Sequence, residues 1–142
     1  MTMEILLVED NDDDIVMTME SFAEANIINK INVVRDGEEA LNYLRKQGSY
    51  EGVATPGLIL MDINMPKKNG FEVLAELKAE PSLCHIPVVI LTTSQREEDI
   101  VKSFAAGACS YIPKPVGFDN FIEVARQFSM YWELVSRVPS SN

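Results

Sequence analysis

Short apolar runs alternate along the chain with segments of helical periodicity. The apolar runs are expected to be strands buried on both faces, and they cover Ile5–Val8, Ile31–Val34, Leu58–Met61, Val88–Leu91 and Cys109–Ile112. The segments between and after them predict five helices. Strands and helices that alternate in this way predict an α/β domain, in which helices cover both faces of a five-stranded parallel sheet.

The five helices are placed by their apolar positions and end signals. The first begins after Asn11 or Asp12 and has an apolar face of Ile15, Val16, Met19, Phe22 and Ala23. The second follows Asp36-Gly37-Glu38-Glu39, which resembles a capping box, and continues through Leu44. The third runs from Phe71 to a stop before Pro81, after a turn at residues 66–70. The fourth covers about 97–106 and ends at Gly107, and the long fifth covers about 118–137.

Composition is typical of one globular domain. The chain has 142 residues, of which 46% are hydrophobic and 24% are charged. The formal net charge of −10 argues against binding to nucleic acid or to an anionic membrane surface. The N-terminus lacks a signal-peptide pattern and no apolar run is long enough to span a membrane, so we expect a cytoplasmic protein. Cys84 and Cys109 are interpreted as buried reduced thiols, and His85 as a loop residue.

Polar side chains follow four of the predicted strands. The first strand is followed by Glu9 and Asp10, the third by Asp62, the fourth by Thr92, and Lys114 comes shortly after the fifth. Because the carboxyl ends of parallel strands meet at one edge of a sheet, these groups are expected to converge there. Three close carboxylates repel one another unless a cation joins them, and oxygen ligands favour Mg²⁺. Asp62 is then a plausible nucleophile for a phosphoryl group, which Thr92 and Lys114 could hold.

The same residues lie in four recognisable motifs. They are ILLVEDN (5–11), LILMDINMPKKNG (58–70), PVVILTTS (87–94) and GACSYIPKP (107–115). In this order and spacing they resemble the receiver domain of two-component response regulators over essentially the whole chain. The resemblance implies a flavodoxin-like, doubly wound sheet with strand order 2-1-3-4-5 and five helices. The receiver domain is expected to cover residues 1–138, with a tail at 139–142.

The resemblance also implies the chemistry of the site. Asp62 is the expected phosphoacceptor, which takes phosphate from a phosphohistidine on a sensor histidine kinase. Asp10, Asp62 and the backbone carbonyl of Asn64 are the expected ligands of Mg²⁺, and Glu9 is expected to act through water. The protein is then a phosphoacceptor switch and not an enzyme in the usual sense.

Further residues are assigned by the resemblance to phosphoryl binding and switching. Lys114 pairs with the phosphoryl oxygens, and Thr92 donates its hydroxyl to them. Tyr111 is expected to change rotamer with Thr92, which alters the surface of helix four, strand five and helix five. Thr93 stands where the family commonly has a very small residue, so it narrows access to the phosphoryl group.

The chain ends soon after the receiver, so the output is expected to be a contact made by the receiver itself. The loop at Gly48–Gly57 is expected to be unusually long, and the last helix is long and aromatic. In both features the chain resembles regulators paired with cyanobacterial phytochrome kinases. The last helix carries a second apolar stripe beside its core face. We expect this stripe to form a homodimer interface, and it consists of Val124, Phe128, Tyr131, Val135 and Val138.

Two other functions use a similar set of residues. A magnesium-dependent aspartyl-phosphate hydrolase of the haloacid dehalogenase type needs a second acid two positions after the nucleophile, and Asn64 stands there. A receiver-fold module that signals without phosphate would not require Asp10, Asp62, Thr92 and Lys114 together. Both remain as alternatives to the response regulator.

Overall fold

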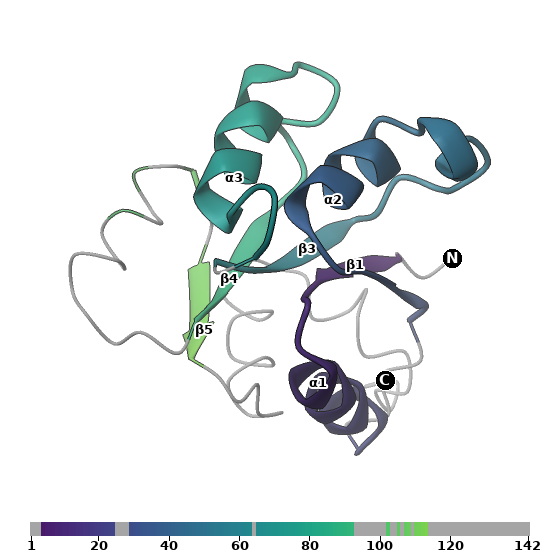
Figure 1. Ribbon diagram of the computed structural model, residues 1–142, viewed down its shortest axis with the longest axis vertical. Coiled ribbons are helices and arrows are strands. Elements are labelled where there is room, and N and C mark those ends of the chain that lie inside the picture. Colours follow the sequence, from purple (N-terminus) through teal and green to yellow (C-terminus); the bar gives the residue numbers. More distant parts are fainter. Residues whose placement is uncertain are drawn as a thin grey trace, which may run out of the picture.

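A five-stranded parallel sheet forms the centre of the molecule (Figure 1). The computed structural model describes residues 4–24, 29–63, 65–92, 102, 105, 107–108 and 110–113. The strands are β1 (Ile5–Val8), β2 (Ile31–Val34), β3 (Leu58–Asp62), β4 (Val88–Thr92) and β5 (Ser110–Pro113). Their order, β2-β1-β3-β4-β5, and the parallel pairing of every neighbouring pair confirm the predicted topology.

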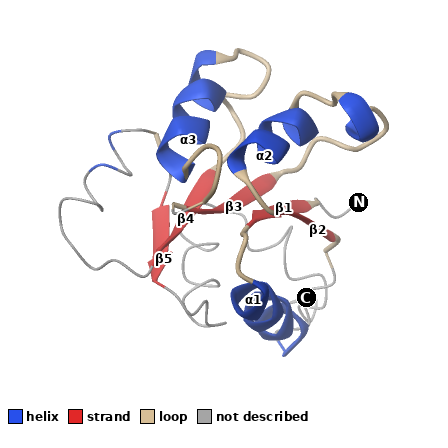
Figure 2. Cartoon of the chain, in the orientation of Figure 1, coloured by secondary structure: helices blue, strands red, loops and turns tan. Residues whose placement is uncertain are grey.

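Helices lie on both faces of this sheet (Figure 2). Helix α1 (Asp12–Glu24) covers one face, whereas α2 (Gly37–Leu44) and α3 (Gly70–Ala79) lie side by side on the other. These three helices were expected. The helices expected over 97–106 and 118–137 fall outside the described residues, except that Lys102 and Ala105 have helical backbone. Among the helices that are described, none is long and apolar enough to cross a membrane.

The core is built from the two central strands and the inner faces of the helices. Residues 5–8 of β1 and 58–61 of β3 have no exposed surface, which is why these strands are continuous apolar runs. Leu41 of α2 and Leu74 and Leu77 of α3 pack onto one face of the sheet in the same way. The core therefore holds the central strands in place, and with them the residues at their carboxyl ends.

The apolar face predicted for α1 is wrong in part. Phe22 is buried and Ile15 is half-buried, but Val16 and Met19 are 53% and 38% exposed. The other buried residue of this helix is Thr18, whose hydroxyl donates to the carbonyl oxygen of Asp14 at 2.8 Å. Because the Thr18 hydroxyl is already hydrogen-bonded within the helix, it does not need a water partner. The face of α1 that carries Thr18 can therefore be buried.

Local signals at two loops also differ from expectation. The reciprocal capping box lies at the start of α3, between Asn69 and Glu72, and not at Asp36. Asp36 does cap α2 by accepting from the Glu39 amide at 2.7 Å, but the Glu39 carboxylate accepts from the Tyr50 hydroxyl. Tyr50 ends the short 3-10 helix η1 (Gly48–Tyr50), so the start of the Gly48–Gly57 loop is tied to α2.

Cys84 is exposed, which corrects the prediction of a buried thiol. It lies in the turn between α3 and β4, where Leu83 and Ile86 are buried and His85 is exposed. The two apolar residues occupy the inward positions of this turn, so the residues between them face outward. His85 is a loop residue, as predicted, and Cys109 lies outside the described residues.

Candidate functional site

Three carboxylates meet at the carboxyl ends of the two central strands. Glu9 and Asp10 follow β1, and Asp62 is the last residue of the neighbouring strand β3. One oxygen from each side chain lies within 4.8 Å of the other two. Glu9 and Asp62 are 1% and 5% exposed, whereas Asp10 is exposed to solvent. The predicted convergence of these three residues is thus confirmed by the structure.

Glu9 is positioned by the strand beside it and by the start of α1. Its amide donates to the carbonyl oxygen of Val34 at 3.0 Å, which extends the β1–β2 pairing by one residue. Its carboxylate accepts from the amide of Asn11 at 3.2 Å. The Asn11 side chain in turn accepts from the Asp14 amide at 3.0 Å, so Asn11 caps α1. The first turn of α1 therefore begins directly after the cluster, with the positive end of the helix dipole nearby.

Asp62 is positioned by the turn that leads into α3. The amide of Gly70 donates to the carbonyl oxygen of Ile63 at 2.8 Å and closes this turn. Gly70 lies so close to the strand end that a Cβ atom there would be 2.6 Å from the main-chain oxygen of Asp62. The capping box fixes the same helix start, because the Asn69 and Glu72 side chains each accept from the other residue's amide at 2.9 Å.

Two further predicted site residues lie at or near the same edge. Thr92 is the last residue of β4, and its register partner on β5 is Pro113. Tyr111 of β5 is opposite Ile90 and is half-buried against the hydrophobic core. Asn64, Thr93 and Lys114 lie outside the described residues, as does the predicted dimer stripe of Val124, Phe128, Tyr131, Val135 and Val138.

Several supporting residues were not predicted from the sequence. Asn11 was expected only to mark the start of the first helix, but its amide also donates to the Glu9 carboxylate. Gly70 was assigned to a turn, although its contact with the Asp62 main chain is what requires a glycine. The spacing of Asn69 and Glu72 fits the capping-box pattern, so this pair could have been recognised.

The three carboxylates form a donor set that suits a small hard cation. All the available ligand atoms are oxygens, two of the three side chains are buried, and three negative charges in this space repel one another. A divalent cation relieves that repulsion, and magnesium is typically bound by a few carboxylates together with water and phosphate oxygens. The arrangement can therefore hold a cation beside the Asp62 carboxylate, where a phosphoryl group would arrive.

Comparison with known proteins gives one consistent result. The sequence profile of the response regulator receiver domain matches residues 5–126. Response regulator Rcp1 from Synechocystis sp. is 37% identical over 137 residues, which cover 96% of this chain and 93% of Rcp1. A solved Mn²⁺-bound form of Rcp1 has a TM-score of 0.76 at 37% identity, and the match covers 96% of this chain and 97% of that one.

Two other solved structures are also similar. The bacteriophytochrome response regulator RtBRR has a TM-score of 0.86 at 38% identity, and the match covers 99% of this chain and 86% of that one. The phosphorylated cyanobacterial phytochrome response regulator RcpA has a TM-score of 0.80 at 40% identity, and the match covers 99% of this chain and all 100% of that one.

Proposed function

The chain belongs to the response regulator receiver domain family, and on that premise we propose that Asp62 is its phosphoacceptor. Receivers of this family act in two-component signalling and are phosphorylated by histidine kinases. The observation that carries the proposal is the close approach of the Glu9, Asp10 and Asp62 carboxylates at the ends of β1 and β3. Asp62 ends the central strand of the sheet, in which Met61 pairs with Val8 of β1 and Asp62 pairs with Leu91 of β4.

Magnesium is the proposed cofactor of this site. Receiver domains bind Mg²⁺ or Mn²⁺ at an acidic pocket, and Rcp1 has been solved with Mn²⁺. In this chain Asp10 and Asp62 would hold the ion directly, with the backbone carbonyl of Asn64, and Glu9 through water. When bound, the ion supplies positive charge that offsets the carboxylates and the incoming phosphoryl oxygens.

The transfer itself needs one nucleophile and good positioning. A carboxylate oxygen of Asp62 attacks the phosphorus of the kinase phosphohistidine, and an O–P bond forms as the P–N bond breaks. The histidine nitrogen leaves with the electron pair of that bond, and the product is an acyl phosphate on Asp62. Lys114 is proposed to pair with the phosphoryl oxygens, and Thr92 and Thr93 to border them.

The proposed readout is a change in the surface next to β5. The acyl phosphate adds negative charge at the end of β3. Thr92 ends the neighbouring strand β4, and its hydroxyl is proposed to donate to the phosphoryl oxygens. Tyr111, opposite Ile90 of β4, is proposed to change rotamer when Thr92 moves. The output is a contact made by this surface, and a homodimer formed through the stripe at residues 124–138 is its proposed form.

A phytochrome is the proposed source of the phosphate. RtBRR and RcpA are named as bacteriophytochrome and cyanobacterial phytochrome response regulators, and the present chain matches each over 99% of its length. A sensor histidine kinase of the phytochrome class is therefore the first partner to test, with phosphotransfer from its phosphorylated form as the measurement.

Acetyl phosphate with magnesium, followed by intact mass, distinguishes this function from its alternatives. A lasting adduct of about 80 Da, one PO₃H group, is expected for a receiver. Continuous release of inorganic phosphate without an adduct would instead indicate a hydrolase. A chain that remains unmodified and releases no phosphate would indicate a phosphate-independent module.

A further inference from the structure

The connection that follows Asp62 is held between two helices. This connection, residues 63 and 65–69, links the end of β3 to the start of α3. Lys68 sits in it, directly against the first residue of α2. A Cβ atom on Gly37 would lie 2.3 Å from the main-chain oxygen of Lys68 and 2.8 Å from its Cβ. Such distances are far below van der Waals contact, so α2 can support the connection this closely only with a glycine there.

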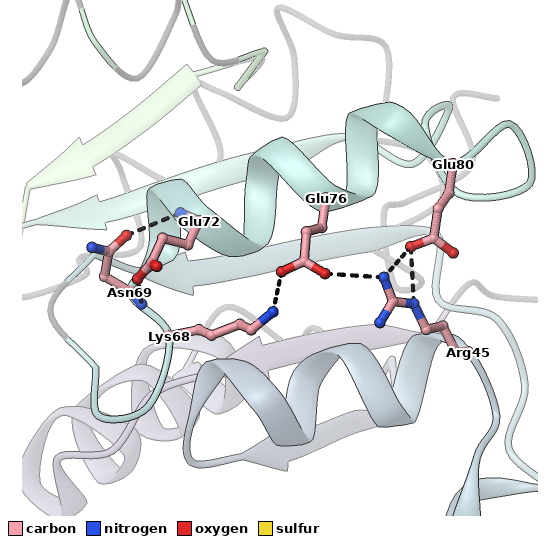
Figure 3. A network of polar contacts seen from close by, with 6 residues as sticks. All are labelled: Arg45, Lys68, Asn69, Glu72, Glu76 and Glu80. Atoms are coloured by element: carbon pink, nitrogen blue, oxygen red, sulfur yellow. Dashed lines mark hydrogen bonds and ion pairs between the residues drawn. The ribbon is translucent and has the colours of Figure 1, made fainter.

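The side chain of Lys68 is bound to the other helix. Its ammonium group donates to the carboxylate of Glu76 in the middle of α3 (Figure 3). Glu76 also accepts from Arg45 at 3.2 Å, and Arg45 donates to Glu80 at 2.9 and 2.5 Å. The hydrogen bonds from Lys68 and Arg45 lower the pKa of the Glu76 carboxyl group, so this group stays charged at neutral pH.

The rest of the connection is fixed in the same region. Lys67 has a left-handed backbone with φ of 67°, and its ammonium group lies 3.6 Å from the Asp36 carboxylate that caps α2. The Lys68 amide donates to the Pro66 carbonyl oxygen at 2.8 Å. Lys68 thus joins α2, through its main chain, to α3, through its side chain, and does so between Asp62 and the Asn69 cap.

We propose that Lys68 is a positioning residue of the phosphoacceptor site, acting through its main-chain contact with Gly37 and its ion pair with Glu76. The inference rests on the proposed function of Asp62. By holding the connection between α2 and α3, Lys68 sets the position of the backbone that leaves Asp62. Groups that hydrogen-bond to a metal's ligands typically change metal affinity about 10–100-fold when removed. Lys68 acts one step further out, through the backbone that follows Asp62, so we expect an effect at the lower end of that range.

A purely structural role is the competing explanation, and the same network supplies its control. Arg45 also binds Glu76, but at the end of α2 that is remote from the connection. Replacing Arg45 with Met removes ion pairs between α2 and α3 and leaves the Lys68–Glu76 pair in place. Lys68→Met also removes one ion pair, but this pair is the one that ties the connection after Asp62 to α3. A general loss of helix packing affects both variants, whereas a positioning effect belongs to Lys68 alone.

Magnesium affinity, measured by isothermal titration calorimetry on the full chain, is the main test. We expect Lys68→Met to weaken binding about tenfold, and Lys68→Arg to retain most of the wild-type affinity because it keeps the charge. We expect Arg45→Met to stay within about twofold of wild type, in the range of an exposed ion pair. Gly37→Ala should weaken binding at least as much as Lys68→Met, while Gly52→Ala, where a Cβ would contact nothing within 4 Å, should not.

The proposal is overturned if folded Lys68→Met binds magnesium as wild type does, or if Arg45→Met loses as much affinity as Lys68→Met. Should Lys68→Met fail to fold, Glu76→Gln removes the charge that Glu76 offers to both Lys68 and Arg45. It is expected to weaken binding about threefold, and Arg45→Met shows how much of that loss belongs to Arg45. A second readout needs no metal. The amide NMR signals of Asp62 and Ile63 in metal-free protein should shift in Lys68→Met and not in Arg45→Met, and unchanged signals would contradict positioning even if magnesium does not bind.

Phosphate uptake from acetyl phosphate separates this inference from the proposed function. If the wild type binds magnesium but accepts no phosphate, the phosphoacceptor proposal fails, and the affinities of the variants still decide the role of Lys68. If the wild type accepts phosphate and all variants match it in affinity and rate, the role of Lys68 is wrong and the proposed function stands.

Discussion

Gly70, the first residue of α3, lies directly against the main-chain oxygen of Asp62. A Cβ atom at this position would come within 2.6 Å of that oxygen and 3.0 Å of the Ile63 Cα atom. Both neighbours are backbone atoms of a central strand end and cannot move aside cheaply. This contact therefore positions the start of α3 against the backbone of Asp62, and a larger residue at position 70 would displace one of them.

The Gly70→Ala substitution should lower both stability and phosphate uptake. Overpacking of this kind costs about 1–3 kcal/mol of unfolding free energy, and the shift of Asp62 should slow modification by acetyl phosphate. Urea unfolding and intact mass measure the two effects. Gly52→Ala is the matched control, because a Cβ there meets nothing within 4 Å. Equal stability and equal uptake for the two alanine variants would show that the close contact does not matter.

Asn69→Ala should lower stability by about 1 kcal/mol, the usual effect of removing a helix cap. The Asn69 side chain accepts from the Glu72 amide at 2.9 Å, and without it that amide loses its partner at the start of α3. Glu72→Gln keeps a side-chain acceptor for the Asn69 amide and should be close to neutral. Urea unfolding of the three proteins checks this, and an Asn69→Ala midpoint equal to wild type would contradict the capping role.

The central strands and the acidic edge could be predicted because each depends on the local sequence. Residues 5–8 and 58–61 are apolar without interruption, and a strand buried on both faces requires that pattern. Once the strands are parallel, the residues that follow them must gather at one edge, so Glu9, Asp10 and Asp62 follow from topology.

The supporting contacts could not be predicted in this way because they depend on distances between elements. Lys68 meets Glu76 and Gly37 only after α2 and α3 are packed, and nothing in the local sequence gives that spacing. The inward face of α1 was missed because Thr18 satisfies its hydroxyl within the helix and then packs like an apolar residue. Glu39 illustrates the same limit, since its role in a capping box is replaced by a bond from Tyr50.

Tyr50 should make stability depend on alkaline pH. Burial, followed by the hydrogen bond to Glu39 and nearby negative charge, raises the pKa of Tyr50 from 10.0 to about 12. Because the pKa is raised in the folded state, the contribution of Tyr50 to the free energy of unfolding is complete below pH 10. It is lost as pH rises from about 10 to 12. The difference in unfolding free energy between wild type and Tyr50→Phe should therefore be constant from pH 7 to 9 and shrink above pH 10. A difference that does not change up to pH 11.5 would contradict this assignment.

Magnesium should stabilise the folded chain, because the carboxylate cluster exists only when β1 and β3 are paired. At a magnesium concentration a hundred times the dissociation constant, the expected gain is about 2.7 kcal/mol. Asp10→Asn should lose most of this gain and Glu9→Gln less, since Glu9 is proposed to act through water. Without metal, Asp10→Asn should be at least as stable as wild type because one of three repelling charges is removed. Thermal unfolding with magnesium and with a chelator measures each effect, and an equal magnesium response in wild type and Asp10→Asn would contradict the site.

The most direct test of the account is the site of phosphorylation. Wild type and Asp62→Asn are treated in parallel with acetyl phosphate and magnesium and with a phosphorylated histidine kinase of the phytochrome class, and intact mass is followed over time. We expect wild type to gain one phosphoryl group, about 80 Da, which peptide mapping places on Asp62, and Asp62→Asn to gain none from either donor. Full uptake by folded Asp62→Asn would contradict the central claim that Asp62 is the sole phosphoacceptor.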